Sequence, residues 1–179
     1  MSDQALDDDL FSLSFAVKRS VRYHAKRAYF FNKLNQLSNM ISILLASALI
    51  SNILDNSMLF DIKLSSILGV IALIVASIVI VFDATGQAQK HYELSKRFTT
   101  LEKNMLKQNP TRDDYIEWKK ERLSIETEDI NVLHVLNTIC HNELIRAEDL
   151  SSDHMVKISI LQRLLSPIMD FRSHTIKKG

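Results

Sequence analysis

Two long stretches without an ionisable side chain limit what this chain can fold into. Residues 37–54 read LSNMISILLASALISNIL, and residues 64–82 read LSSILGVIALIVASIVIVF. At about 1.5 Å per residue, helices of these lengths extend roughly 27–29 Å, which is close to the roughly 30 Å hydrocarbon core of a bilayer. The sequence therefore predicts two transmembrane helices, 37–54 and 64–82, that form a hairpin.

A buried pair of helices in a soluble bundle is the alternative to membrane spans. Such helices can also be apolar on every face, but the remaining segments are charged and hardly long enough to cover two of them. The second stretch is the stronger candidate for a membrane span, because serine and asparagine lower the hydrophobicity of the first. Neither is a signal peptide, since the first apolar block starts behind a long charged segment.

Basic residues surround the hairpin unequally. The loop between the two stretches contains one basic residue, Lys63. The flanks on the opposite side carry Lys18, Arg19, Arg22, Lys26, Arg27 and Lys33 before the first stretch, and Lys90, Lys96, Arg97 and Lys103 after the second. Because positive residues stay on the cytoplasmic side, both termini are expected in the cytoplasm.

The rest of the chain is also expected to be helical, which makes the fold class all-α. The chain has 3 Gly and 2 Pro, and few alternating β-branched runs outside the apolar stretches. We expect the transmembrane hairpin to continue into cytoplasmic stalk helices, unbroken over 15–54 and over 83–109 except at Gly86. In this register Lys26 would face Glu93. Pro110 ends the region, so residues 1–109 and 110–179 are the two predicted parts.

The C-terminal part is predicted to be helical and to pack on the stalk or on itself. Thr111 and Asp114 resemble a capping box at the start of a charged helix over 112–126. An apolar stripe of 3.6-residue period predicts a second helix near 129–147. Ser151 and Ser152 are expected to cap a last helix that ends near Pro167.

Small residues on the two apolar stretches recur at helical spacing. They are Ser65, Gly69, Ala72 and Ala76 on the second stretch, and Ser42, Ala46, Ser47 and Ser51 on the first. Such faces let helix backbones approach closely in lipid. Two alternatives stay open: the faces pack the hairpin against itself, or one of them packs against another subunit. Only an oligomer could enclose a pore. The serine hydroxyls could line it, or could bond to carbonyls of the preceding turn.

Catalytic, cofactor and metal chemistry finds little support in the sequence. His134, Cys140 and His141 are the one group that suggests a metal, but their spacing is not a standard one and a fourth ligand is missing. Cys140 on an apolar stripe is more typical of a core residue. His24, His91 and His141 lack a neighbouring nucleophile, and no glycine-rich phosphate loop exists. We expect no enzyme activity, no cofactor and no metal.

The segment 14–32 mixes basic and aromatic residues next to the first span. A lipid-headgroup interface explains this composition better than nucleic-acid binding, because the cations already have a topological role. Together with the residues after the second span, it defines a cytoplasmic regulatory or headgroup-facing set. The set comprises Arg22, Tyr23, His24, Lys26, Arg27, His91, Lys96 and Arg97.

Three segments carry a resemblance to the SLATT family of bacterial two-transmembrane effectors, which are associated with SMODS nucleotidyltransferases and SLOG sensor domains. They are FSLSFAVKRSVRYHAKRAYFF at 11–31, DATGQAQKHYELSKRFTTLEKNM at 83–105, and the run from Leu136 to Leu144. The last of these resembles members linked to reverse transcriptases. The resemblance covers most of the chain.

This resemblance implies an antiviral defence effector that permeabilises the bacterial inner membrane as a homo-oligomer. Its trigger would be a nucleotide second messenger or an operon-encoded partner, a nucleotidyltransferase or a reverse transcriptase. The alternative is a membrane-anchored scaffold that recruits a cytoplasmic partner through its C-terminal helices. Direct nucleic-acid binding is not expected.

Overall fold

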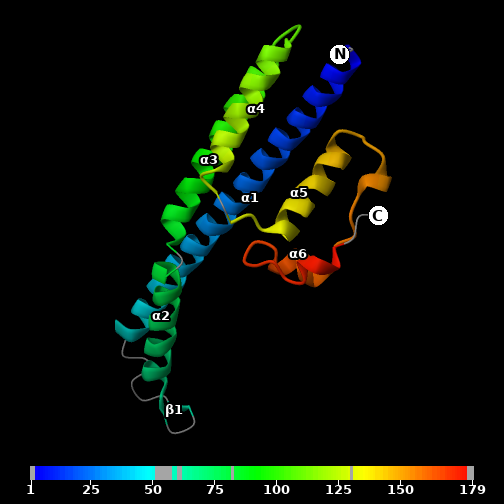
Figure 1. Ribbon diagram of the computed structural model, residues 1–179. Helices are drawn as coiled ribbons and strands as arrows, with labels where there is room; N and C mark the ends of the chain where they lie inside the picture. The colour runs from blue at the N-terminus through cyan, green and yellow to red at the C-terminus, as the bar shows by residue number, and fades with distance from the viewer. Residues whose placement is uncertain (1–2, 51–57, 60–61, 82, 130, 177–179) are drawn as a thin grey trace. The chain divides into compact units, whose positions relative to one another are not determined.

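The computed structural model describes residues 3–50, 58–59, 62–81, 83–129 and 131–176. In this part the chain is all-α, as the sequence predicts, apart from a two-stranded β-ribbon with two residues in each strand (Figure 1). The helices are α1 (Asp3–Ile50), α2 (Leu64–Val81), α3 (Ala84–Asn104), α4 (Arg112–Glu126), α5 (His134–Ala147) and α6 (Ile160–Leu165), with 3-10 turns η1 (Ser152–His154) and η2 (Ser173–Thr175). Strands β1 (Met58–Leu59) and β2 (Ile62–Lys63) are antiparallel, with Met58 opposite Lys63.

The chain forms two compact units. Unit 1 comprises Met1–Arg27 and His91–Gly179, and unit 2 comprises Ala28–Lys90. Unit 1 thus contains the first part of α1, the part of α3 from His91 onward, and every element that follows α3. The predicted division at residue 110 falls inside unit 1.

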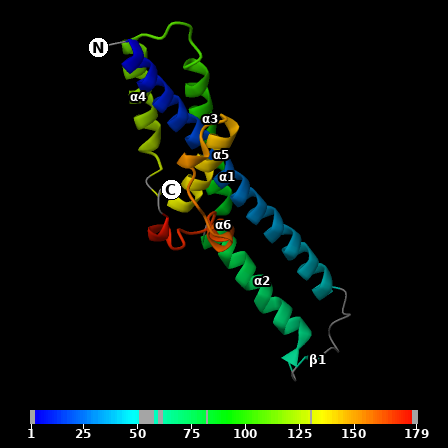
Figure 2. The ribbon, with the colours of Figure 1, turned by 90° about the vertical axis from the view of Figure 1, so that its right-hand side faces the viewer.

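Unit 1 has its main core where α1, α3 and α4 meet (Figure 2). Leu13 and Val17 of α1 pack with Phe98 of α3 and with Trp118 of α4, and all four are buried. The capping box at the start of α4 is confirmed: Thr111 accepts from the Asp114 backbone N–H, and the Asp114 carboxylate accepts from the Thr111 N–H at 2.8 Å. Burial of large apolar side chains is what holds these three helices together.

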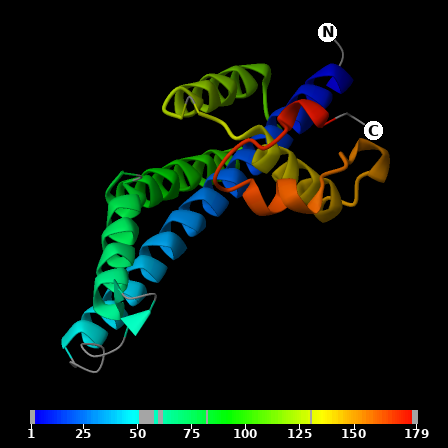
Figure 3. The same cartoon turned by 90° about the horizontal axis from the view of Figure 1, so that it is seen from below.

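Helix α5 lies against α1 in unit 1, through Tyr23, Leu136 and Cys140 (Figure 3). Two ion pairs flank this contact, Lys18–Glu148 at 2.8 Å and Lys26–Glu143 at 3.0 Å. Lys26 thus forms its ion pair with α5 and not with Glu93 of α3, which the simple hairpin register had predicted. The reason is that α5 packs beside this part of α1, which the register of a hairpin alone cannot include.

The predicted last helix is much shorter than expected. Ser151 caps only the turn η1, and α6 begins later, with Ser159 as its N-cap and Gln162 completing a capping box. Extended backbone at Met155 separates the two elements. Several short segments therefore replace the one helix that was expected between Ser151 and Pro167.

Unit 2 contains the second part of α1, and α2 runs in the opposite direction to it (Figure 1). A small cluster forms where Phe31 of α1 packs with Ala84 and Ala88 of α3. Helix α3 begins at Ala84, after Asp83, whose φ of 43° is in the left-handed region. The Gly86 N–H donates to the Asp83 carboxylate at 3.2 Å, and a side chain at position 86 would collide with that carboxylate. The helix break thus lies at Asp83, and Gly86 makes room for its cap.

Among the described residues, no helix combines the length and the hydropathy needed to cross a membrane. Both predicted spans extend outside the described residues: 51–54 of the first and Phe82 of the second.

Candidate functional site

Several residues of the predicted regulatory set converge inside unit 1. Tyr23, His24 and Arg27 come from α1, where their spacing of one and three residues places them on neighbouring faces. His91 comes from α3, about two turns after the helix begins. Asp129, in the connection between α4 and α5, joins them. We call these five residues the histidine cluster.

Three polar atoms form the centre of the histidine cluster. The Nδ1 atoms of His24 and His91 are 3.0 Å apart. The Oδ2 atom of Asp129 lies 3.8 Å from Nδ1 of His24 and 3.9 Å from Nδ1 of His91. His24 is 5% exposed and His91 is 2% exposed, so the three atoms lie in the interior. Buried polar groups are costly unless they are partnered, and these residues partner one another.

Arg27 determines which ring nitrogen of His91 carries the proton. The Nε–H of Arg27 donates to Nε2 of His91 at 3.3 Å, and its Nη1 donates to the carbonyl of Pro167 at 2.7 Å. An acceptor at Nε2 assigns the proton of a neutral His91 to Nδ1, from where it is donated to His24. Burial lowers the pKa of Arg27, while Tyr23 and the Asp129 carboxylate favour its charged form.

Aromatic rings enclose the cluster. The His24 ring stacks on Phe98 with centroids 5.4 Å apart and planes 10° apart, and Tyr23 meets its edge. The Tyr23 hydroxyl accepts from the Leu133 N–H at 3.0 Å, which attaches the start of α5 to the cluster. Burial raises the pKa of Tyr23, so this hydroxyl stays neutral. The cluster therefore connects α1, α3 and α5 in a weakly solvated setting.

The donor atoms that could hold a metal ion are those of His24, His91 and Asp129, which lie within 4.8 Å of one another. The sequence offered a different group, His134, Cys140 and His141, whose spacing argued against a metal site, and the structure does not bring these three together among the described residues. Cys140 points into the core beside Tyr23, His134 is exposed at the start of α5, and the His141 ring contacts Phe15. Successive faces of α5 separate these three side chains.

The other members of the predicted regulatory set lie outside the cluster. Lys26 pairs with Glu143, and Arg97 forms an ion pair with Glu128. Lys96 is exposed on α3, and Arg22 is half-buried on α1. Exposed ion pairs of this kind contribute little to stability.

The predicted oligomerisation residues lie in unit 2. Ser42, Ala46, Ser47 and Ala76 are exposed, while Gly69 and Ala72 are half-buried. Ser51 and the side chain of Ser65 lie outside the described part. The Ser47 hydroxyl donates to the Ile43 carbonyl at 2.9 Å, so the commoner alternative for a serine in a helix applies there. A methyl group at Gly69 would meet no atom within 4 Å beyond its own helix.

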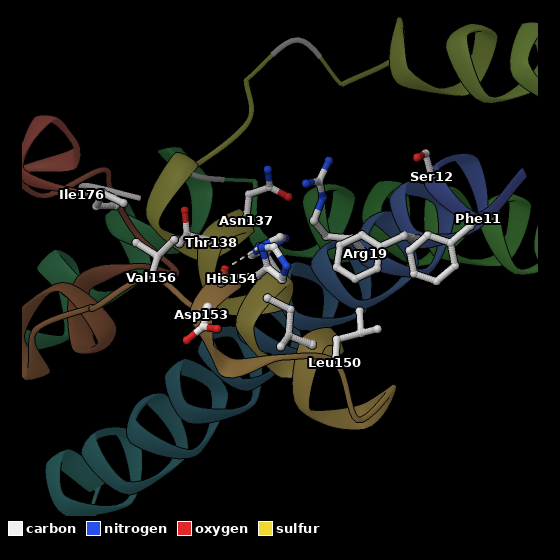
Figure 4. A pocket seen from close by; sticks show the side chains of 13 residues that line it. Phe11, Ser12, Arg19, Asn137, Thr138, Leu150, Asp153, His154, Val156 and Ile176 are labelled. Carbon is white, nitrogen blue, oxygen red and sulfur yellow. Dashed lines mark hydrogen bonds between the residues drawn. The ribbon is translucent and has the colours of Figure 1, made fainter. Parts of the chain in front are cut away.

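Unit 1 also contains a pocket of about 720 Å³ that the sequence did not predict (Figure 4). Phe11, Phe15 and Arg19 of α1 belong to its lining. Residues of α5 and of the η1 region also line it, together with Ile176. The buried Nε of Arg19 has no hydrogen-bond partner among the described residues. Burial and the nearby Arg122 lower the pKa of Arg19.

Comparisons with known proteins give no information about this site. No protein-family model matches the chain, and no curated protein or solved structure shows a significant match.

Asp129 is the cluster member that the sequence reasoning missed. It belongs to an acidic run, Glu126 to Asp129, that looks like ordinary solvated surface. Asp129 is far from both histidines along the chain, so no regular spacing could connect the three residues. A charged residue in a short connection between two helices was the only available hint.

Proposed function

We propose that this protein is a membrane effector whose apolar hairpin oligomerises and permeabilises the inner membrane, with unit 1 as its cytoplasmic regulatory part. The setting of a bacterial antiviral defence system, and a nucleotide signal or an operon-encoded partner as trigger, rest on the SLATT resemblance alone. The membrane and assembly steps have support from unit 2.

The main support is the surface of α2, the described part of the apolar stretch 64–82. Its 18 residues contain no ionisable side chain. Large apolar side chains are exposed on it, namely Val70, Ile71, Leu73, Ile74, Ile78, Ile80 and Val81. Exposed apolar area of this extent is rare on monomeric soluble proteins and is typical of surfaces that lipid or another chain covers.

Gly69 supports assembly between subunits over packing within one hairpin. The space beside it is open, so its small size serves no contact within the described part of unit 2. In lipid, a small residue on an open face allows a second helix backbone to approach closely. We infer that this face of α2 contacts another subunit.

The test compares Gly69→Leu with Val70→Leu at the adjacent, exposed position. Wild-type protein is expected to stay in the membrane after an alkaline carbonate wash and to depolarise the inner membrane when overproduced. Gly69→Leu should abolish depolarisation and reduce the oligomer mass in detergent, because leucine blocks close approach, while Val70→Leu should change neither. Retained depolarisation by Gly69→Leu, or toxicity with an intact membrane potential, would contradict the proposal.

The scaffold alternative is favoured by one observation in unit 1. Ile160 is 89% exposed and Leu164 is 71% exposed, one turn apart on α6. An apolar face of this kind could bind a cytoplasmic partner. Deleting residues 111–179 would be a poor test, because Trp118 and Ile125 belong to the main core. The double variant Ile160→Ser/Leu164→Gln leaves that core intact. If it removes function while depolarisation on overproduction persists, the scaffold is the better description.

A further inference from the structure

We infer that His24, His91 and Asp129 form a binding site for a divalent metal ion of the zinc class. The proposal starts from the three separations of 3.0, 3.8 and 3.9 Å, which join the same three atoms. A triangle with these sides has a circumscribed radius of about 2.1 Å. One point therefore lies at a distance from all three atoms that matches Zn–N bonds of roughly 2.0–2.1 Å and Zn–O bonds of roughly 2.0–2.2 Å.

The same separations favour a tetrahedral ion over an octahedral one. Ligand atoms at about 2.1 Å from a tetrahedral metal are about 3.4 Å apart, whereas neighbouring ligands of an octahedral metal are about 3.0 Å apart. The separations of 3.8 and 3.9 Å are closer to the tetrahedral value than to the octahedral one. The common point lies in the plane of the three donor atoms, so tetrahedral coordination requires the Asp129 oxygen to move closer to both histidines by a few tenths of an ångström. Two imidazole nitrogens and one carboxylate oxygen suit zinc, and a tetrahedral ion would keep a fourth position for another ligand.

Burial makes the donor atoms suitable for holding such an ion. The side chains of His24, His91 and Asp129 are 7%, 2% and 9% exposed. They belong to α1, α3 and the α4–α5 connection, so one ion would link three segments that are far apart in sequence. The stacked Phe98 ring orients His24, which reduces the motion that binding must suppress.

Arg27 provides the most specific consequence of the proposal. A metal on Nδ1 of His91 requires the ring proton to move from Nδ1 to Nε2, while His24 keeps its proton on Nε2. Without a metal, the Nε–H of Arg27 donates to Nε2 of His91. With a proton on Nε2, two N–H donors would face each other and this hydrogen bond would be lost. Metal-bound histidines normally donate this N–H to an acceptor. Arg27 must therefore leave His91 when the metal binds, and its bond to the Pro167 carbonyl would couple this movement to the segment after α6.

The experiment titrates chelator-stripped full-length protein in detergent with Zn²⁺, and with Co²⁺ as a reporter of tetrahedral coordination by visible absorption. We expect one ion per chain. His24→Ala, His91→Ala and Asp129→Ala should each weaken Zn²⁺ binding by more than about 100-fold, because each removes a ligand. His134→Ala and Cys140→Ser, which change donors outside the cluster, should leave the affinity unchanged.

Arg27→Gln is the variant that separates this site from a merely structural cluster. It keeps all three ligands, removes a competing positive charge, and offers a carbonyl oxygen to the Nε2–H of His91. It should tighten Zn²⁺ binding by about tenfold. Absence of binding to the wild type, binding that survives the three alanine variants, or weaker binding by Arg27→Gln would each overturn the proposal. None of these measurements involves membrane activity, so failure of the proposed function would leave their result unaffected.

Discussion

At the scale of single residues, Cys140 illustrates how position decides chemistry. It lies on the face of α5 that packs against Tyr23 and Leu136, and it is fully buried. Burial raises the pKa of its thiol from 9.0 to about 12, with smaller opposing effects of nearby Lys26 and Arg22. The reactive species of a cysteine is its thiolate. Cys140 is thus a core residue, as its place on the apolar stripe predicts.

We therefore predict that a maleimide labels Cys140 only after unfolding. At pH 8 the folded protein should react at least about 100-fold more slowly than the double variant Cys140→Ser/Ser124→Cys, which carries its thiol at an exposed position of α4. Labelling that is quenched at a series of times and analysed by mass spectrometry gives both rates. Equal rates would show that α5 does not cover this thiol.

The raised pKa of Cys140 also makes the stability of the folded protein depend on pH. The folded state keeps a proton that the unfolded state releases above its ordinary value of 9.0. The contribution of the buried, neutral thiol to the free energy of unfolding is therefore complete below about pH 9 and is lost as the pH rises toward about 12. Cys140→Ser should flatten this alkaline decline.

At the scale of elements, α5 depends on a cap from outside its own sequence. Its N-cap residue, Leu133, has no side chain that can cap. The Asp170 carboxylate accepts instead from the backbone N–H groups of His134 and Val135, at 2.9 and 3.0 Å. A carboxylate at a helix N-terminus satisfies unpaired donors and opposes the positive end of the helix dipole. The segment after α6 therefore stabilises the start of α5.

Asp170→Ala should lower the free energy of unfolding by about 1–2 kcal/mol, the usual cost of losing an N-cap. Hydrogen exchange should accelerate first at the amides of His134 and Val135. Asp153→Ala is the matched control, because its exposed carboxylate accepts from Ser151 within the short turn η1. A loss of stability as large in the control would show that the cap geometry is not responsible.

At the scale of the whole molecule, unit 1 owes its core to helices that are distant in sequence. Leu101 of α3 is fully buried in the cluster that contains Trp118 of α4 and Val17 of α1. The chain has a single tryptophan, so its fluorescence reports on unit 1.

Leu101→Ala should destabilise unit 1 by about 2–5 kcal/mol, because a buried leucine leaves a cavity. Denaturant unfolding followed by Trp118 fluorescence measures this change. Leu123→Ala on α4, where the side chain is exposed, should stay within about 0.5 kcal/mol of the wild type. Similar losses in the two variants would contradict the assignment of the core.

The features that could be predicted from the sequence are local. The Thr111–Asp114 cap and the buried stripe of α5 were predicted, because each depends on residues within about four positions of one another. The helix before Pro110 ends earlier than predicted, at Asn104. Helical geometry alone converts such spacing into structure. The sequence also selected His24 and His91, although it gave no reason for them to meet.

Contacts between groups that are distant in sequence follow from the packing of the folded chain. Asp129 joins the two histidines, Asp170 caps α5, and Lys26 pairs with Glu143, and none of these contacts has a spacing that could reveal it. Each depends on how whole helices pack and on where their connections end. Packing of that kind is set by the summed burial of many apolar side chains. A polar residue therefore acquires its partner as a consequence of the core, which no short segment of sequence contains.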